Sequence, residues 1–423
     1  MLQIDHIYEF FYNIVFNKNI ETYSLFEGVP EKDPCKSKLT VWTPNLYGHE
    51  KALFYDQEPI LSNFIDPYIK HFTWRENYSI EWHKEYLEKQ GNPVPDDIHK
   101  LNLEDPDRIY KSNRILITSE KSQYLNELLK KHKLHKLYYF FHGFAALDWY
   151  RGYYALHYNK PIIKTYKKDF ITYNRLITED RSYRIYFISQ LAKHNLIDKG
   201  LVSFGVSDDV QHWRDELERN NYSKLSNHAR QEIWNTLPDL PERLIIDNEY
   251  CPGNASSRIL YSIDNIADIN ANNYDAFWHI VTETVFYYDK LHLTEKIFKP
   301  IVSKQPFMLL AAPGNLEYLK SYGFKTFEGI IDESYDTIQD PDARVDAVVA
   351  QMKWYSELSD SDKLDVMKKL EPIIEYNFHH FYGKFKEIIV DELITNCENL
   401  FTEIDYQHDV DFDFDLIKKI LLN

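Results

Sequence analysis

Three adjacent polar residues, Thr294, Glu295 and Lys296, stand where an apolar helical segment is expected to begin. A helix N-terminus carries unpaired backbone N–H groups and a partial positive charge, so phosphate binds there readily. Thr294 suits the N-cap position, and a lysine in the first turn is favourable when an anion lies in front of it. The carboxylate of Glu295 can accept hydrogen bonds from two ribose hydroxyls. The three residues therefore fit the diphosphate and ribose of a nucleotide; the alternative is a capped surface helix with a solvated Glu–Lys pair.

Two more polar residues, Asn174 and Arg184, flank the start of another expected helix. The planar guanidinium of an arginine can hold a pyrophosphate through two parallel hydrogen bonds. Ligands bind at the carboxyl ends of strands in open α/β sheets, where both residues are expected to lie. We therefore predict that they contact the same ligand as Lys296. The alternative is a surface helix whose arginine pairs with the nearby Glu179 or Asp180.

A third group of candidates lies earlier in the chain. Glu58 ends a short apolar run and precedes Pro59, which stops a sheet ladder. A carboxylate held at a strand end that faces a cleft suits a general base; the alternative is an ordinary strand-end acid. His142, Asp148 and Trp149 follow another expected strand, and they suit the hydroxyls and the ring face of a sugar acceptor. The alternative for His142 is a buried, hydrogen-bonded core histidine.

Motifs for metals and bound cofactors are missing from the sequence. It contains no GxxxxGK(S/T), GxGxxG or HExxH pattern, and the acidic run at 411–415 is interpreted as a solvated tail. Cys35, Cys251 and Cys397 are widely spaced and form no CxxC pair, which argues against a zinc site or a disulfide framework. We therefore expect no metal and no bound cofactor, and a reducing compartment.

The elements that must position these residues alternate along the chain. Apolar runs of strand length alternate with helical patterns in two series, and a strand–helix–strand unit with short joints has parallel strands. The expected strands lie at 39–42, 51–60, 114–118, 136–144, 164–175, 200–205, 243–248, 277–287, 306–312 and 324–331. The expected helices lie at 119–133, 181–197, 295–304 and 315–323, with further helices to about residue 400.

This alternation predicts an α/β fold with two Rossmann-like domains that face each other across a cleft. A length of 423 residues also exceeds what one ordinary hydrophobic core supports. The predicted domains are an N-terminal α/β domain at 1–163 that binds an acceptor, a C-terminal α/β domain at 164–400 that binds a nucleotide, and an acidic, then amphipathic tail at 401–423.

Composition and charge exclude several classes of protein. The formal net charge of −17 and the pI of about 5.5 disfavour non-specific binding to nucleic acid or to an anionic membrane. No run of about 18 apolar residues is present, and the N-terminal segment carries Asp5 and Glu9 where a signal peptide would be basic. We therefore expect a cytoplasmic protein without a membrane span; the sequence does not define its oligomeric state.

The order of the candidate residues resembles the α-1,3-fucosyltransferase family of inverting glycosyltransferases, in its bacterial or phage-type form. That family has an acidic E-S-P segment, then an R-x-x-F/Y-x-x-x-L helix followed by a glycine, and finally T-E-K before a helix. The counterparts here are DQEPI with Glu58, RIYFISQL with Arg184, and LTEKIF at 293–298. The match is clearest over 170–330, and the serine between the glutamate and the proline is missing.

The resemblance implies a GT-B fold of two Rossmann-like domains and a role for each residue. In such an enzyme Glu58 is the catalytic base, Arg184 and Lys296 hold the diphosphate, and Glu295 holds the ribose. The predicted donor-binding residues are then Asn174, Arg184, Glu283, Thr294, Glu295 and Lys296, and the predicted acceptor-binding residues are His142, Asp148 and Trp149.

The predicted function is transfer of a fucose-like sugar, with inversion, from a GDP-sugar to a hydroxyl of a glycan or another acceptor. The nucleotide sugar is a co-substrate in this reaction. Two alternatives stay open: a glycosyltransferase that uses a UDP-sugar on a modified nucleic-acid base, and a nucleotide- or glycan-binding module without turnover. The negative net charge argues against nucleic acid, and the combination of Glu58, Arg184 and Lys296 argues against a module without turnover.

Overall fold

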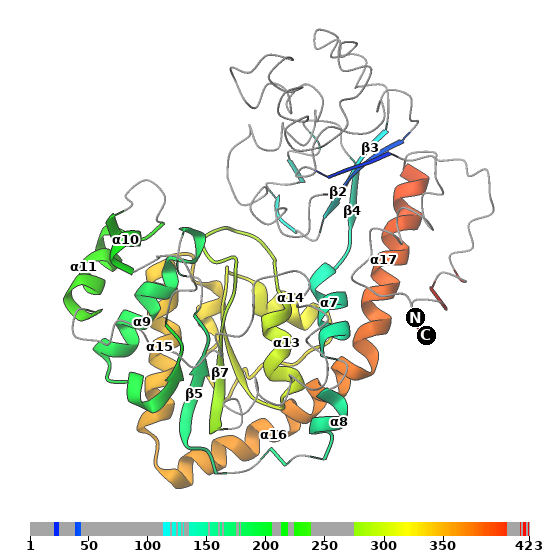
Figure 1. The fold of residues 1–423 in the computed structure, drawn as a ribbon. Coiled ribbons are helices and arrows are strands. Elements are labelled where there is room, and N and C mark those ends of the chain that lie inside the picture. Colours follow the sequence, from blue (N-terminus) through cyan, green and yellow to red (C-terminus); the bar gives the residue numbers. More distant parts are fainter. Residues whose placement is uncertain are drawn as a thin grey trace, which may run out of the picture. The chain divides into compact units, whose positions relative to one another are not determined.

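In the computed structural model the chain divides into two compact units (Figure 1). Unit 1 comprises Met1–Phe140 and Val390–Asn423, and unit 2 comprises Phe141–Ile389. The division into domains at 1–163 and 164–400 stays a prediction. The residues that the structure describes are 21–24, 39–43, 113–118, 121–123, 126–127, 130, 135–150, 153–159, 161–162, 165–174, 177, 179–204, 213–218, 224–237, 275–403, 415, 418–419 and 422.

Unit 1 contains a parallel sheet with the strand order β1-β2-β3-β4. Its strands are β1 (Glu21–Ser24), β2 (Leu39–Thr43), β3 (Asn113–Thr118) and β4 (His135–Tyr138). The direct pairing of β3 with β4 confirms that strands expected at 114–118 and from 136 are parallel neighbours. The second strand was expected to run to residue 144 but ends at Tyr138, and helix α7 begins at Phe141.

The C-terminal part of the chain also belongs to unit 1. Helix α17 (Lys384–Glu403) crosses the boundary between the two units at Val390. Within unit 1, the side chain of Asn396 donates to the carbonyl of Tyr138 (2.9 Å), at the end of β4. The ammonium of Lys121 pairs with the carboxylate of Glu392 (2.8 Å). These two contacts join residues that are 258 and 271 positions apart in the sequence.

Unit 2 is built on a second parallel sheet with the strand order β6-β5-β7-β8. Its strands are β5 (Lys168–Thr172), β6 (Gly200–Val202), β7 (Ala276–Thr282) and β8 (Phe307–Leu310). All seven residues of β7 are buried, as is typical of a parallel strand that is covered on both faces. The chain steps to one side from β5 to β6, and to the opposite side from β7 to β8. The strand order therefore reverses between β5 and β7.

Helices cover both faces of this sheet, which confirms the α/β character (Figure 1). Helices α9 (Tyr183–Lys193) and α15 (Pro341–Glu357) pack together on one side, and α13 (Glu295–Val302) lies on the other side against β7 and β8. Opposite faces are expected because right-handed crossovers in opposite directions place their helices on opposite sides. The other helices of unit 2 are α7 (Phe141–Trp149), α8 (Tyr153–His157), α10 (Trp213–Glu218), α11 (Asn227–Thr236), α14 (Asn315–Ser321) and α16 (Asp360–Tyr382).

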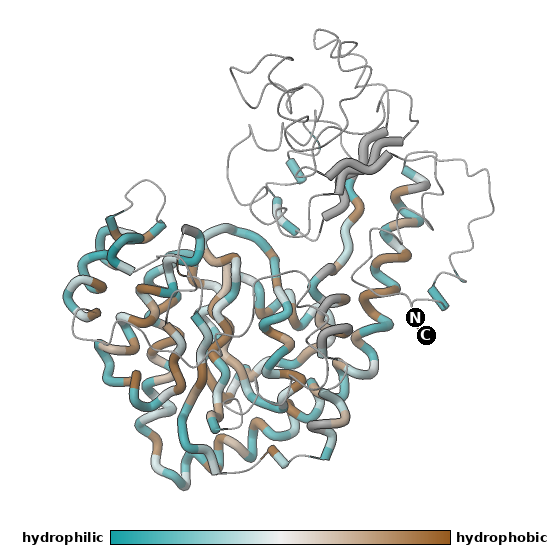
Figure 2. The backbone as a smooth tube through the Cα atoms, viewed as in Figure 1, coloured by the Kyte–Doolittle hydropathy of each residue, from teal (hydrophilic) through white to brown (hydrophobic). Residues whose placement is uncertain are grey.

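The core of unit 2 lies between the sheet and these helices. Apolar residues gather along its strands, as Figure 2 shows. Trp278 of β7 contacts the rings of Phe327 and Tyr355, and Phe298 of α13 packs against Phe381 and Phe385. Burial of such large side chains is the main favourable term in folding. The sheet is therefore a firm support for the loops at its carboxyl edge.

One expected strand, at 324–331, is wrong. The segment forms a turn, with only an isolated bridge between Glu328 and Ile331. Gly329 has a φ of 80°, and the N–H groups of both Ile330 and Ile331 donate to the carbonyl of Phe327. Phe324, Phe327 and Ile331 are buried, but the backbone N–H of Phe327 donates to the carboxylate of Glu333 (2.6 Å) and not to a neighbouring strand.

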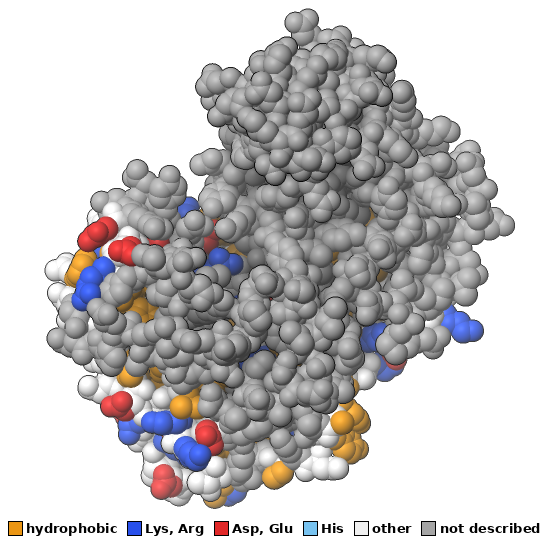
Figure 3. Space-filling model, viewed as in Figure 1, with side chains coloured by type: hydrophobic (Ala, Val, Ile, Leu, Met, Phe, Trp, Pro, Cys, Tyr) orange, Lys and Arg blue, Asp and Glu red, His pale blue; other side chains and the backbone are white. Residues whose placement is uncertain are grey.

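Within the described ranges, no helix has both the length and the apolar character needed to cross a membrane. The described surface of unit 2 that is visible in Figure 3 carries basic and acidic side chains intermixed.

Candidate active site

The candidate residues gather at the carboxyl edge of the sheet in unit 2. Thr172 and Thr282 pair with Val202 and Leu310 at the ends of their strands, so the loops after β5 and β7 leave from the same edge. The side chain of Thr282 donates to the carbonyl of Tyr173 (3.0 Å), which joins the ends of β5 and β7. The strand order reverses between these two strands, and ligands of open α/β sheets bind at such reversals.

Glu283 follows β7 directly, and its fully buried carboxylate caps helix α13. It accepts a hydrogen bond from the backbone N–H of Thr294 (3.0 Å) and another from the Thr294 hydroxyl (2.6 Å). It also accepts one from the backbone N–H of Thr284 (3.2 Å). The sequence predicted an anion in front of this helix, and the structure shows that the chain itself supplies one.

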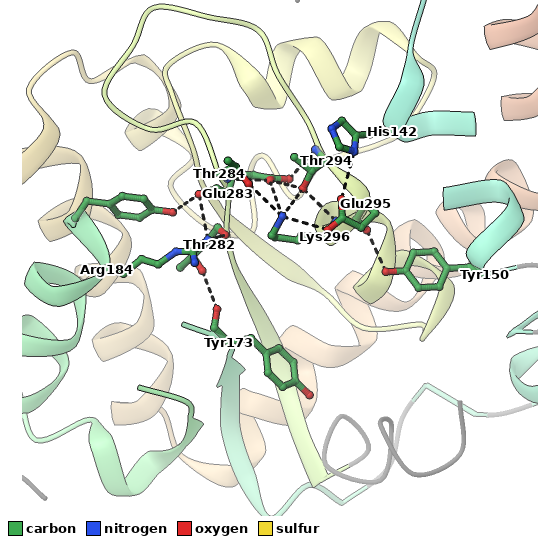
Figure 4. Close-up of polar contacts among 11 residues, drawn as sticks. His142, Tyr150, Tyr173, Arg184, Thr282, Glu283, Thr284, Thr294, Glu295 and Lys296 are labelled. Carbon is green, nitrogen blue, oxygen red and sulfur yellow. Dashed lines mark hydrogen bonds and ion pairs between the residues drawn. The ribbon is translucent and has the colours of Figure 1, made fainter. Parts of the chain in front are cut away.

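Lys296 lies in the first turn of α13, and its ammonium has a full set of acceptors. It donates to the hydroxyls of Thr294 (3.0 Å) and Thr284 (3.2 Å) and to the carboxylate of Glu295 (3.2 Å). The buried carboxylate of Glu283 is 4.0 Å away. The Lys296 side chain is nevertheless 37% exposed. This cation is therefore fixed in position and still accessible from outside the fold (Figure 4).

The two carboxylate oxygens of Glu295 contact different side chains. Its Oε1 accepts from Lys296, and its Oε2 lies 3.3 Å from Nδ1 of His142. Burial alone would raise the pKa of Glu295, but the ammonium of Lys296 and the ring of His142 outweigh burial and hold this pKa well below its usual range. The side chain is 23% exposed. The site therefore presents an ionised carboxylate beside an ammonium group.

Helix α7 contacts Glu295 at two places. His142 meets the carboxylate, and the hydroxyl of Tyr150 donates to the backbone carbonyl of Glu295 (3.3 Å). The ring of His292 packs edge-on against the ring of His142 at 5.2 Å. His142, predicted to bind the acceptor, is thus brought to a predicted donor-binding residue. Asp148 lies in the same helix.

Arg184 approaches the end of β7 from the other side, as Figure 4 shows. It is buried, and its guanidinium donates to the backbone carbonyls of Thr282 (2.7 Å) and Glu283 (3.3 Å). The hydroxyl of Tyr183 donates to the same carbonyl of Glu283 (2.6 Å). Burial raises the pKa of Tyr183, so the hydroxyl stays protonated as a donor. The hydrogen bonds of Arg184 therefore hold in place the loop that carries Glu283. Any contact of Arg184 with a ligand would be a second role.

Asn174 follows β5 and is fully buried. Its Nδ2 donates to the hydroxyl of Thr172 (3.1 Å), and its Oδ1 has no hydrogen-bond partner in the part of the chain that the structure describes. A buried acceptor without a partner is costly, so this oxygen is a position where a ligand donor would add stability. Glu58 and the side chains of Asp148 and Trp149, all predicted site residues, lie outside the part of the chain that the structure describes.

The contacts around Lys296 include residues that sequence reasoning missed. Thr284 supplies one of the acceptors of the ammonium, and Tyr183 supports the loop beside Arg184. Their only signal in the sequence is proximity to predicted residues. Among the described residues, no group of three or more His, Cys, Asp and Glu residues has the arrangement of a metal site.

No protein-family model, curated protein or solved structure matches the chain.

Proposed function

We propose that the chain is a glycosyltransferase that binds a nucleotide diphosphate sugar at the carboxyl edge of the sheet in unit 2. One observation carries the proposal: the partly exposed carboxylate of Glu295 and ammonium of Lys296 lie side by side at the start of α13. They lie next to the reversal of strand order between β5 and β7. A diphosphate needs a cation and a helix N-terminus, and a ribose needs a hydrogen-bond acceptor.

Binding would require a change of partners at Lys296. The ammonium already has three acceptors, so a diphosphate oxygen must replace one of them. The contact with Glu295 is the most readily exchanged because both side chains are partly exposed. The carboxylate of Glu295 can then accept the ribose hydroxyls, and the buried Glu283 stays in place as the cap of α13.

The proposed reaction is sugar transfer with inversion. The acceptor hydroxyl loses its proton to the base, and its oxygen forms a bond to the anomeric carbon of the sugar. The bond from that carbon to the diphosphate breaks, and the nucleoside diphosphate leaves with the electron pair. Lys296 and the N–H groups at the start of α13 stabilise the negative charge that develops there. Glu58 is proposed as the base because of the family resemblance.

The same resemblance favours a GDP-sugar with a fucose-like sugar, a hydroxyl acceptor bound in the N-terminal half, and a GT-B arrangement of two domains. These finer statements are part of the proposal. The two alternatives, a UDP-sugar donor and a binding module without turnover, predict different results in nucleotide titration and in a sugar-transfer assay.

The experiment is calorimetric titration of the full chain with GDP and UDP. Lys296→Ala removes one charge-assisted contact, worth about 1.5–3 kcal/mol, and should weaken binding of the preferred nucleotide by about 10- to 150-fold. Lys353→Ala is the matched control, because this lysine pairs only loosely with Glu357 on the surface of α15 (3.8 Å). Lys296 is a cleaner probe than Arg184, whose removal also frees the carbonyls of β7.

The possible outcomes distinguish the proposed function from its alternatives. Wild-type protein that binds neither nucleotide refutes the proposal, and unchanged affinity of Lys296→Ala removes this residue from the site. Preference for UDP over GDP favours the alternative donor. Glu58→Ala should bind the nucleotide normally but transfer no sugar from the corresponding nucleotide sugar; binding with no turnover in wild type would indicate a module that only binds.

A further inference from the structure

Residues in and directly after helix α7 contact Glu295 of α13 at both the side chain and the backbone of that glutamate. His142, near the start of α7, contacts the carboxylate of Glu295, and Tyr150, just after its end, contacts the carbonyl of Glu295. Tyr150 is itself fixed, because its own carbonyl accepts a hydrogen bond from the hydroxyl of Tyr382 (2.8 Å) in α16. A rigid chain of contacts therefore runs from α16 through α7 to Glu295.

The contact with His142 determines which oxygen of Glu295 faces Lys296. With Oε2 held by His142, only Oε1 reaches the ammonium. Without that hold, the carboxylate can rotate and place both oxygens against Lys296. A carboxylate in that orientation would compete with a diphosphate for the ammonium and would have fewer lone pairs for a ribose.

We propose that His142 is a positioning residue that keeps the carboxylate of Glu295 oriented toward the ribose hydroxyls of the nucleotide. This inference rests on the proposed function, and it gives His142 a role on the donor side. Nδ1 of His142 lies 3.3 Å from Oε2 of Glu295, and the hydroxyl of Tyr150 donates to the backbone carbonyl of the same residue. Among the described residues, the polar neighbours of the pair include Lys296 and the ring of His292.

A positioning role makes a prediction that a purely structural role does not. The loss of His142 should affect only the part of the affinity that comes from the ribose hydroxyls. The test compares GDP with 2′,3′-dideoxy-GDP, which lacks those hydroxyls and keeps the base and the diphosphate. If UDP proves to be the preferred nucleotide, UDP and its dideoxy analogue take their places.

The variants are His142→Phe, which keeps a ring without a hydrogen-bond donor, and His142→Asn, whose amide can donate from the position of Nδ1. Wild type should bind GDP at least about tenfold more tightly than the dideoxy analogue, as hydrogen bonds to a charged acceptor imply. In His142→Phe the affinity for GDP should fall to that for the analogue, while the affinity for the analogue changes less than about twofold. His142→Asn should restore most of the preference for GDP.

Tyr150→Phe gives an independent measurement that does not require a change at the buried histidine. It removes one hydroxyl and keeps the ring that packs against Tyr153. It should reduce the preference for GDP in the same direction, by about 2- to 13-fold, the value of a neutral hydrogen bond.

The results separate this inference from the proposed function. Wild type that binds GDP and prefers it, together with a His142→Phe variant that keeps the full preference, overturns the role of His142 alone. An equal loss of affinity for GDP and for the analogue also overturns it, because that pattern indicates general damage to the site. Wild type that binds no nucleoside diphosphate refutes the proposed function and, with it, this inference.

Discussion

The buried His279 makes the unfolding free energy of unit 2 depend on pH. It lies in the middle of β7, is buried, and packs against the ring of Tyr173. Burial, together with the nearby ammonium of Lys299, lowers the pKa of His279 to about 3. In the unfolded chain an ordinary histidine has a pKa of about 6.5. The folded protein thus keeps this ring neutral at pH values where the unfolded chain binds a proton.

The sign and size of the effect follow from this difference. A pKa that is lower in the folded state means that the unfolded state binds more protons below about pH 6.5, so stability falls as the pH decreases. The loss begins near the unfolded pKa and is complete near the folded pKa of about 3. Between about pH 7.5 and about pH 5, this one histidine should cost about 2 kcal/mol of unfolding free energy.

The assay is urea unfolding at these two pH values, followed by hydrogen exchange of the β7 peptide, which reports on unit 2. The chain has 17 histidines, so the wild type must be compared with His279→Gln, which does not titrate. The variant should lose about 2 kcal/mol less than wild type between the two pH values, whatever its stability at the higher pH. His228→Gln, at an exposed position in α11, is the control and should behave as wild type. Equal losses in wild type and His279→Gln would refute the reasoning.

Two further predictions concern the support of the site. Glu283→Ala should destabilise unit 2 by about 3–5 kcal/mol in urea unfolding, because it removes a buried carboxylate and leaves its hydrogen-bond donors unpaired. Glu317→Ala, at an exposed position, is the control and should cost little. Equal losses of unfolding free energy in the two variants would contradict the capping role of Glu283. Gly323→Ala should cost at least about 1 kcal/mol and lower the Tm, because Gly323 has a φ of 87° and a Cβ there would lie 2.7 Å from the ring of His380. Gly329→Ala meets no neighbour and should lower the Tm less; equal shifts would show that the ring of His380 moves aside at no cost.

Local patterns predicted the elements of unit 2 that carry the site. The segment at 295–304 was expected to be a helix with Thr294 as its N-cap, and the structure has α13 at Glu295–Val302 with that cap. Hydrophobic periodicity and cap chemistry are properties of a short window, so they can be read without tertiary information. The strand expected at 277–287 ends earlier, at Thr282, because the next residue turns its carboxylate toward α13.

Hydrophobic periodicity and cap chemistry could not predict contacts between segments that are far apart in the sequence. Nothing near His142 in the sequence indicates that it meets Glu295, because their proximity depends on how α7 packs against α13. The same holds for Glu283, which the sequence presented as a ligand-binding candidate and the structure shows as a buried cap. A carboxylate near a helix start suits a ligand or the helix itself, and only the fold decides between these uses.

The discontinuity of unit 1 affects the order in which the protein folds during synthesis. Its sheet comes from the first part of the chain, yet the partners of Tyr138 and Lys121 lie after Val390. All of unit 2 is synthesised before those partners, so the contacts of Tyr138 and Lys121 with α17 can form only after unit 2 has been made. A nascent chain that ends at Ile389 and continues into a linker long enough to clear the ribosome should therefore protect β7 from protease while β4 is still cleaved, the reverse of the usual order from the N-terminus.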